Sequence, residues 1–197
     1  LIVSYITARR RRKYLKGASE THKSEVPVIV VGNLTIGGTG KTPLVKYIAS
    51  ELLSLGYKPG LVSRGYGGKF KETLLVSDQT PVKQTGDEAQ ILATLNLPFY
   101  IDKSRVRAVK AITDNHDCDI IISDDGLQHY KMNRDIEIVV IDGKRRFGNN
   151  LTFPAGPLRE SKARLNSVDF IVNNSGPTDE GEYLMNVSPS RFVHLKS

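Results

Sequence analysis

The stretch from Asn33 to Leu44, NLTIGGTGKTPL, combines three glycines with an adjacent lysine and threonine. This pattern is typical of a phosphate-binding loop, G-x-x-x-x-G-K-[ST], although Thr35 stands in place of the first glycine. In such loops backbone N–H groups line an anion-binding hollow, the lysine reaches the β- and γ-phosphates, and the hydroxyl coordinates Mg²⁺. The sequence therefore predicts a nucleotide site made of Thr35, Ile36, Gly37, Gly38, Thr39, Gly40, Lys41 and Thr42.

The alternative interpretation of this loop is a glycine-rich turn that merely packs a helix against a strand. The flanking sequence favours the phosphate loop, because the apolar run 26–33 (VPVIVVGN) is typical of a buried parallel strand. The run 42–55 (TPLVKYIASELLSL) then has helical spacing of its apolar residues. A strand before the loop and a helix after it are what nucleotide binding requires.

Two adjacent carboxylates, Asp124 and Asp125, follow the apolar run 119–123 (DIIIS). Acids at the carboxyl end of a buried strand lie where α/β sheets bind ligands, and one of them could hold Mg²⁺ directly or through water. An exposed acidic turn would have the same sequence. The pattern does not decide which aspartate contacts the metal.

Five further polar residues have both a structural and a functional interpretation. Asp87, in TGDEA, is either a helix-capping acid or a general base that accepts a proton from a substrate hydroxyl. Arg64, Arg105 and Arg159 are either ordinary surface residues or ligands for anionic groups. His129 either orients water or substrate near the two aspartates, or packs behind the strand.

The elements that must position these residues alternate between strands and helices. This alternation predicts an α/β fold in which helices cover both faces of a mostly parallel sheet, as in the three-layer sandwich of P-loop NTPases. Besides 26–33, the expected strands are 58–66, 72–78, 98–102, 118–126, 135–143 and 170–174. Besides 42–55, the expected helices are one that starts at 86–88, then 104–111 and 159–169.

Charge is concentrated at the N-terminus. Residues 1–23 hold seven basic residues and one acid, so they contribute six of the seven net positive charges. The near-neutral remainder argues against a general nucleic-acid-binding face. The basic run 9–13 (RRRRK) could sit on an anionic membrane surface, bind nucleic acid, or be a solvated terminus, and the residues before it are too few to span a bilayer. One cysteine excludes a disulfide framework, and no zinc-binding spacing occurs.

Several stretches together resemble one family, the tetraacyldisaccharide 4′-kinases. They are VPVIVVGNLTIGGTGKTP, LVSRGY, GDEA, SDDGLQH, RDIEIVVID and PAGPLRE, in this order, and the resemblance covers 14–173. It implies an ATP- and Mg²⁺-dependent lipid kinase at the cytoplasmic face of a bacterial inner membrane. Such an enzyme transfers the γ-phosphate to the 4′-hydroxyl of a tetraacyl glucosamine disaccharide 1-phosphate, with no nucleic-acid or protein partner expected.

The resemblance also assigns roles to residues. It makes Asp87 the catalytic aspartate, assigns Asp124 and Asp125 to Mg²⁺ and catalysis, and brings Arg105, Arg159 and His129 close to the active site. The implied organisation is a basic membrane-proximal segment at 1–25, a P-loop kinase domain at 26–175, and the start of a linker or C-terminal lobe at 176–197.

Two departures from the family pattern accompany this resemblance. We expect most of an N-terminal membrane-associating helix and a C-terminal lobe to be missing from this sequence. The lobe supplies a histidine that supports the catalytic aspartate, and His194 lies too early and in the wrong context to be that residue. A rival class, the nucleotide-switch ATPases, carries a second lysine in the loop, but Ile36 occupies its place here and counts against that class.

Overall fold

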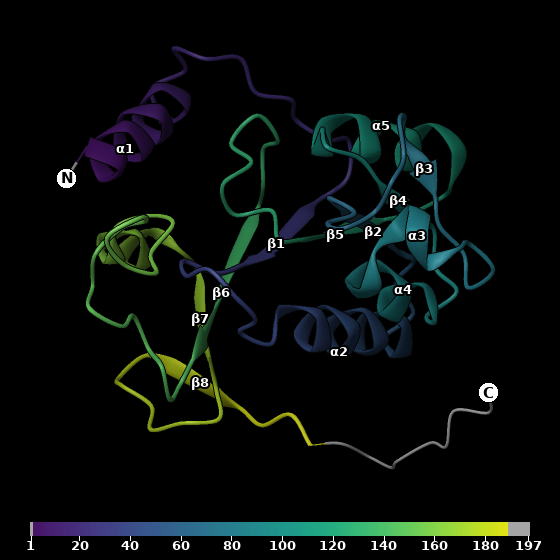
Figure 1. The fold of residues 1–197 in the computed structure, drawn as a ribbon. Coiled ribbons are helices and arrows are strands. Elements are labelled where there is room, and N and C mark those ends of the chain that lie inside the picture. The colour runs from purple at the N-terminus through teal and green to yellow at the C-terminus, as the bar shows by residue number, and fades with distance from the viewer. Residues whose placement is uncertain (1, 189–197) are drawn as a thin grey trace.

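The protein folds around a sheet of eight strands with helices on both faces (Figure 1), in a computed structural model that describes residues 2–188. The predicted α/β, P-loop NTPase-like architecture is confirmed. The strands are β1 (Val28–Gly32), β2 (Pro59–Ser63), β3 (Leu74–Leu75), β4 (Phe99–Ile101), β5 (Ile120–Asp124), β6 (Ile136–Asp142), β7 (Phe170–Asn174) and β8 (Glu182–Met185). The helices are α1 (Ile2–Leu15), α2 (Lys41–Ser54), α3 (Val82–Thr85), α4 (Asp87–Ala93), α5 (Arg105–Asn115) and the 3₁₀ helix η1 (Lys162–Ser167).

The strand order is β3-β4-β2-β5-β1-β6-β7-β8, and every neighbouring pair is parallel except β3–β4. The glycine loop leaves β1 at the centre of this sheet. In the β1–β5 register Val31 pairs with Asp124, so the loop and the aspartates emerge side by side at one edge.

Alternation along β1 produces a core on each side of the sheet. Val28 and Val30 pack into one hydrophobic cluster with α5, while Ile29 and Val31 pack into another with α2 and α4. Figure 1 shows α5 on one face of the sheet and α2 and α4 on the other. Because the central strands are buried on both faces, their sequences are nearly continuous apolar runs.

The structure corrects several predicted elements. The helix expected over 159–169 is only the short η1, and the strand expected over 72–78 shrinks to β3. The pattern predicted neither α3 nor β8, and β8 adds a strand to the sheet within the segment after residue 175 that was predicted to begin a linker or a C-terminal lobe. Short elements like these depend on tertiary contacts more than on periodicity. His194 lies outside the described residues.

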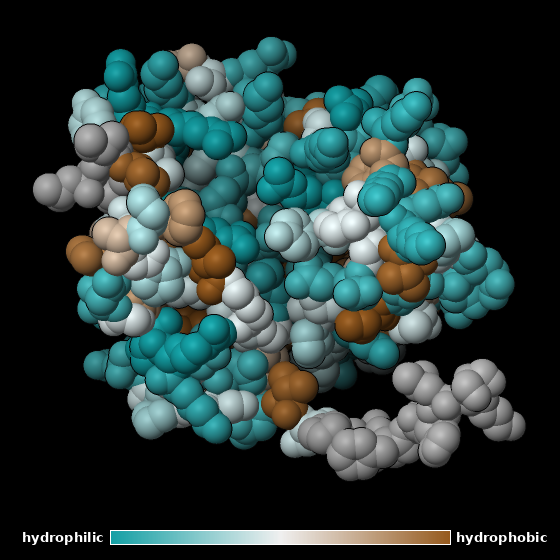
Figure 2. All heavy atoms as spheres, viewed as in Figure 1, coloured by the Kyte–Doolittle hydropathy of each residue, from teal (hydrophilic) through white to brown (hydrophobic). Residues whose placement is uncertain are grey.

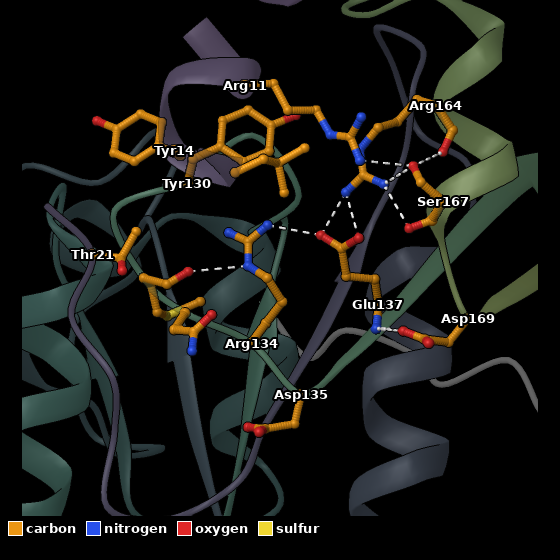
Figure 3. Close-up of a pocket in the computed structure, with 13 residues that line it drawn as sticks. Arg11, Tyr14, Thr21, Tyr130, Arg134, Asp135, Glu137, Arg164, Ser167 and Asp169 are labelled. Carbon is orange, nitrogen blue, oxygen red and sulfur yellow. Dashed lines mark hydrogen bonds and ion pairs between the residues drawn. The ribbon is translucent and has the colours of Figure 1, made fainter. Parts of the chain in front are cut away.

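The basic N-terminal run forms part of α1, and one face of this helix is anchored to the domain (Figure 3). Arg11 donates to Ser167 Oγ at 2.8 Å, and the ring of Tyr14 stacks on Tyr130 with 6.0 Å between centroids. A cavity of about 350 Å³ separates the helix from the amino end of β6. In the lining of this cavity, Arg134 and Arg164 both donate to the carboxylate of Glu137.

The other charges of α1 face solvent. Among its basic residues Arg9, Arg10, Arg12 and Lys13 are exposed. The surface in Figure 2 is largely hydrophilic, and its exposed hydrophobic side chains form small separate groups. Within the part of the chain that the structure describes, no helix has the length and apolar character needed to cross a bilayer.

Candidate active site

The phosphate loop lies between β1 and α2 in a backbone conformation that favours glycine. Gly37 and Gly40 have φ values of 100° and 94°, a left-handed region that side chains disfavour. Gly40 is also the N-cap of α2, so the positive end of this helix points at the loop. No N–H group of 37–40 donates a hydrogen bond within the described residues. The loop therefore presents free donors to an anion.

The loop residues differ in burial according to their predicted roles. Lys41 and Thr42 are buried although both are polar, and Thr35 and Thr39 are buried as well. Ile36, in contrast, is 46% exposed at the outer rim of the loop. The lysine and hydroxyl that the sequence singled out therefore lie inside the site.

Asp124 is the most unusual carboxylate of the site. It is 1% exposed, and neither of its carboxylate oxygens has a hydrogen-bond partner within the described residues. Burial raises the pKa of Asp124 to about 7; Lys41 opposes this shift, while Asp125 and Glu88 reinforce it. A buried carboxylate without donors is poised to bind a cation or a proton.

Asp125 has a different environment, although it is the next residue. It adopts a positive φ of 49° and accepts from Arg159 Nη1 at 2.9 and 3.0 Å, while Lys41 Nζ lies 3.6 Å away. Burial would raise the pKa of Asp125, but Lys41 and Arg159 outweigh it and the net shift is downward. This carboxylate is therefore ionised and already paired.

Arg105 is buried beneath the two aspartates, whereas the sequence suggested a surface residue or an anion ligand. Its Nη2 donates to the backbone carbonyls of Asp124 and Asp125 at 3.2 and 3.1 Å, and its Nη1 donates to the carbonyl of Asp102. Burial lowers the pKa of Arg105 to about 10, with Asp125 and Asp124 opposing the shift. The guanidinium thus holds the turn that carries both carboxylates.

Asp87 is the first residue of α4 and is exposed. Gly86 is the N-cap of this helix, and no side chain makes a capping bond. The carboxylate of Asp87 has no partner within the described residues. The capping interpretation therefore finds no hydrogen bond to support it, and the side chain is free for another role.

Arg64 and His129 flank the site. Arg64 follows β2 directly, is exposed, and is close enough to Arg105 to lower the pKa of that residue. His129 is half-buried, and its Nε2 has no partner within the described residues. Burial, followed by nearby cations of which Arg105 is the first, lowers the pKa of His129 to about 4, so the imidazole is neutral.

Sequence reasoning missed several polar residues of the site. Asn33 at the end of β1 is fully buried and donates to the loop, and Gln128 donates to the carbonyl of Asn33 at 3.1 Å. Glu88 raises the pKa of Asp124, while Arg145, which follows β6, and Asn174, which ends β7, contact the loop. Asn33, Gln128, Arg145 and Asn174 end or follow predicted strands, and this position was the available signal, whereas Glu88 lies on α4 and had no such signal.

The residues present fit a magnesium ion bound together with nucleotide. The described residues contain no cluster of three or more His, Cys, Asp or Glu side chains suited to a metal. A Mg²⁺ in a P-loop site, however, needs few protein ligands, because phosphates and water complete its shell. The unpartnered oxygens of Asp124 and the buried hydroxyl residue Thr42 supply the right oxygen chemistry.

Together the central strand, the loop and the neighbouring aspartate define a P-loop NTPase-like protein. The family model described as tetraacyldisaccharide-1-P 4′-kinase matches residues 1–196. The chain belongs to this family, and the resemblance found in the sequence is confirmed.

Relatives of this chain carry the same description. A tetraacyldisaccharide 4′-kinase of Vibrio campbellii is 47% identical over 199 residues, which cover 100% of this chain and 59% of the relative. A tetraacyldisaccharide 4′-kinase of Psychromonas ingrahamii is 52% identical over 178 residues, 89% of this chain and 56% of the relative. The chain thus spans less than two thirds of the length of these relatives.

A solved structure is also similar. It is the crystal structure of the "apo" form of LpxK from Aquifex aeolicus in complex with ATP. The TM-score is 0.83 at 31% identity, over 94% of this chain and 61% of that one.

Proposed function

We propose that this protein is an ATP-dependent lipid kinase. It transfers the γ-phosphate of ATP to the 4′-hydroxyl of a tetraacyl glucosamine disaccharide 1-phosphate, forming lipid IVA. Family membership over 1–196 supports the reaction, and the ATP in the related crystal structure supports the donor. Both substrates are proposals, because the relatives are considerably longer than this chain.

The observation that carries this proposal is the arrangement of Lys41 between two unlike carboxylates. Its ammonium lies 3.6 Å from Asp125, which is neutralised further by Arg159. Its charge also acts on the unpartnered Asp124. Lys41 begins α2 next to the free N–H groups of 37–40, and this combination of one cation and several donors suits the β- and γ-phosphates of a nucleotide.

The two aspartates take different roles in this proposal. Asp124 and Thr42 would hold Mg²⁺, which supplies neutralisation of phosphate charge. Asp125 stays bound to Arg159, so it pairs only partly with Lys41 and leaves the ammonium able to turn toward the phosphates. Its pKa is lowered by these cations once burial is outweighed, so it remains charged while it does so.

Asp87 acts as the general base in the proposed transfer. Its carboxylate is exposed and unpaired, so it is free to approach a hydroxyl. It accepts the proton of the 4′-hydroxyl while that oxygen forms a bond to the γ-phosphorus. The bond between this phosphorus and the β,γ-bridging oxygen breaks, and ADP leaves. Arg64 and His129 border the same edge, where an anionic lipid headgroup would lie.

The membrane surface is the proposed place of the reaction, at the cytoplasmic face of the bacterial inner membrane. The exposed basic residues of α1 would attract anionic lipid headgroups by about 1 kcal/mol each. Anchoring of Arg11 to Ser167 would keep this helix attached to the domain that holds the phosphate loop.

Transfer of ³²P from ATP to the disaccharide lipid tests the function. The full-length protein is assayed in detergent or lipid with Lys41→Ala and a matched control, Lys46→Ala, which removes an exposed lysine from the same helix. We expect transfer to be lost with Lys41→Ala and retained with Lys46→Ala. Absence of labelled lipid with the unaltered protein would reject the kinase assignment, and activity in Lys41→Ala would reject the role of the loop.

A further inference from the structure

Three successive backbone carbonyls of the phosphate loop accept hydrogen bonds from three different side chains. Asn33 Nδ2 donates to the carbonyl of Gly37 at 3.2 Å. Arg145 Nη2 donates to the carbonyl of Gly38, and Asn174 Nδ2 donates to that of Thr39 at 3.1 Å. These donors follow or end β1, β6 and β7, so three strands contribute one donor each.

Because each peptide group is planar, these contacts to the carbonyls of 37–39 also fix the direction of the N–H groups of 38–40. In a trans peptide, the carbonyl of one residue and the N–H of the next point in opposite directions. The peptide bonds of this loop are trans, since the cis bond of the described chain is Phe153–Pro154. Holding the carbonyls of 37–39 therefore turns the N–H groups of 38–40 the other way, where no described group accepts them.

We propose that Arg145 and Asn174, together with Asn33, are positioning residues that preorient the N–H groups of the loop for the nucleotide phosphates. This inference rests on the proposed function and adds residues that act through the loop. Preoriented donors stabilise an anion better than donors that must first rotate, because no reorganisation accompanies binding.

Arg145 is itself held in place. Its Nε donates to Asp142 Oδ2 at 2.6 Å, and the same carboxylate accepts the backbone N–H groups of Lys144 and Arg145. Asp142 ends β6, so the rigid sheet fixes the base of the guanidinium. The planar guanidinium then spans from Asp142 to Gly38, which a flexible ammonium does less well.

Asn174 is held equally closely. Its Oδ1 accepts from Ser175 Oγ at 3.0 Å, which orients the amide so that Nδ2 faces the loop. A Cβ at Gly40 would come within 2.5 Å of this Nδ2. Gly40 therefore leaves the space that Asn174 Nδ2 occupies, because a side chain at position 40 would collide with this donor.

The contact partners suggest matched variants. Arg145→Ala removes one donor, and Arg145→Lys keeps the charge without the planar fork. Lys144→Ala is the control, because it removes the same charge from the neighbouring exposed residue, whose side chain has no partner among the described residues. Asn174→Ala removes the second donor at unchanged net charge. Melting temperatures are measured first to identify variants that do not fold.

The first measurement uses full-length protein without nucleotide. Backbone ¹⁵N chemical shifts should change at Thr39 in Arg145→Ala and at Gly40 in Asn174→Ala, since each N–H shares a peptide plane with the carbonyl released. Lys144→Ala should leave both shifts unchanged. If the loop shifts of Arg145→Ala equal those of the unaltered protein, Arg145 does not position the loop and the proposal is wrong for this residue.

The second measurement is the Kd of ATP at about 0.15 M salt, with KM for ATP and for lipid. We expect Arg145→Ala and Asn174→Ala to weaken ATP binding and raise KM for ATP about tenfold, the scale of one hydrogen bond to a charged group. KM for lipid should be unchanged, and Arg145→Lys should recover part of the loss. An equal loss in Lys144→Ala would overturn the proposal in favour of general charge attraction. No ATP binding by the unaltered protein would instead refute the proposed function.

Discussion

Arg159 donates from one guanidinium nitrogen to both carboxylate oxygens of Asp125, and Lys41 Nζ lies 3.6 Å from one of these oxygens. Two cations thus share one carboxylate. Because Arg159 neutralises part of this charge, Asp125 holds Lys41 less tightly, and in the proposed function Lys41 turns toward phosphate oxygens. In the proposed function, Asp125 therefore modulates the charge around Lys41, and Asp124 is the aspartate that would hold Mg²⁺.

The first prediction concerns this shared carboxylate. Arg159→Ala should weaken ATP binding about three- to tenfold, because Lys41 then pairs more strongly with Asp125. In the double variant Arg159→Ala with Asp125→Asn, part of the loss should be recovered, with a coupling energy of about 0.5–3 kcal/mol between the two sites. ATP affinities of the four proteins measure it, and strictly additive losses would contradict the arrangement. Lys58→Ala is the control: it breaks an exposed ion pair with Asp117 and should have no effect on ATP affinity.

The second prediction concerns Asp87 as the general base. Asp87→Asn should lower kcat by about 10²-fold or more, the usual contribution of a positioned base, while ATP affinity stays nearly constant. The matched control is Asp114→Asn, which alters an exposed acid on α5. Single-turnover phosphoryl transfer separates chemistry from binding. A near-normal rate for Asp87→Asn would leave the residue without a catalytic role.

The third prediction concerns stability. Arg105→Met should lower the free energy of unfolding by about 2–4 kcal/mol, because it leaves the carbonyls of three residues without their buried donor. Lys110→Met, an exposed position of the same helix, should change it by less than about 0.5 kcal/mol. Urea denaturation measures both values. Similar values for the two variants would show that Arg105 does not hold the Asp124–Asp125 turn.

The fourth prediction concerns pH. Burial, aided by nearby cations, lowers the pKa of His129 to about 4 in the folded protein, below the value of about 6.5 in the unfolded chain. Between these values the unfolded chain binds more protons, so stability falls as pH drops from about 6.5 to 4. His129→Gln removes this dependence and should flatten the decline by about 1 kcal/mol after allowance for partial exposure. Unfolding free energies at pH 7 and pH 4.5 test it; an identical decline in both proteins would refute it.

The fifth prediction concerns α1. Replacing its exposed residues Arg9, Arg10, Arg12 and Lys13 with glutamine should weaken binding to vesicles rich in phosphatidylglycerol at least about tenfold at low salt. Arg11 is left unchanged because it holds Ser167. Vesicles of phosphatidylcholine alone are the control and should bind both proteins equally weakly. Equal binding of the two proteins to the anionic vesicles would contradict a membrane role for this helix.

The sequence by itself determined the central strands, the phosphate loop and its helix, the alternating α/β architecture and the family. These features depend on residues that are neighbours in the chain, such as the apolar run of β1 and the glycines that follow it, so periodicity and spacing reveal them. Periodicity gave wrong bounds for η1 and β3 and missed β8, because each of these elements is short and is stabilised by contacts with residues distant in the chain.

Only the tertiary structure decided which polar residues of the site contact one another and how their environments differ. Arg159 and Asp125 are 34 positions apart, Arg145 and Gly38 are 107 apart, and Asn174 and Thr39 are 135 apart. Folding brings them together because parallel strands end at one edge of the sheet, whatever their separation in the chain. The different environments of Asp124 and Asp125 arise in the same way: distant cations reach one carboxylate, while the other is buried without a donor.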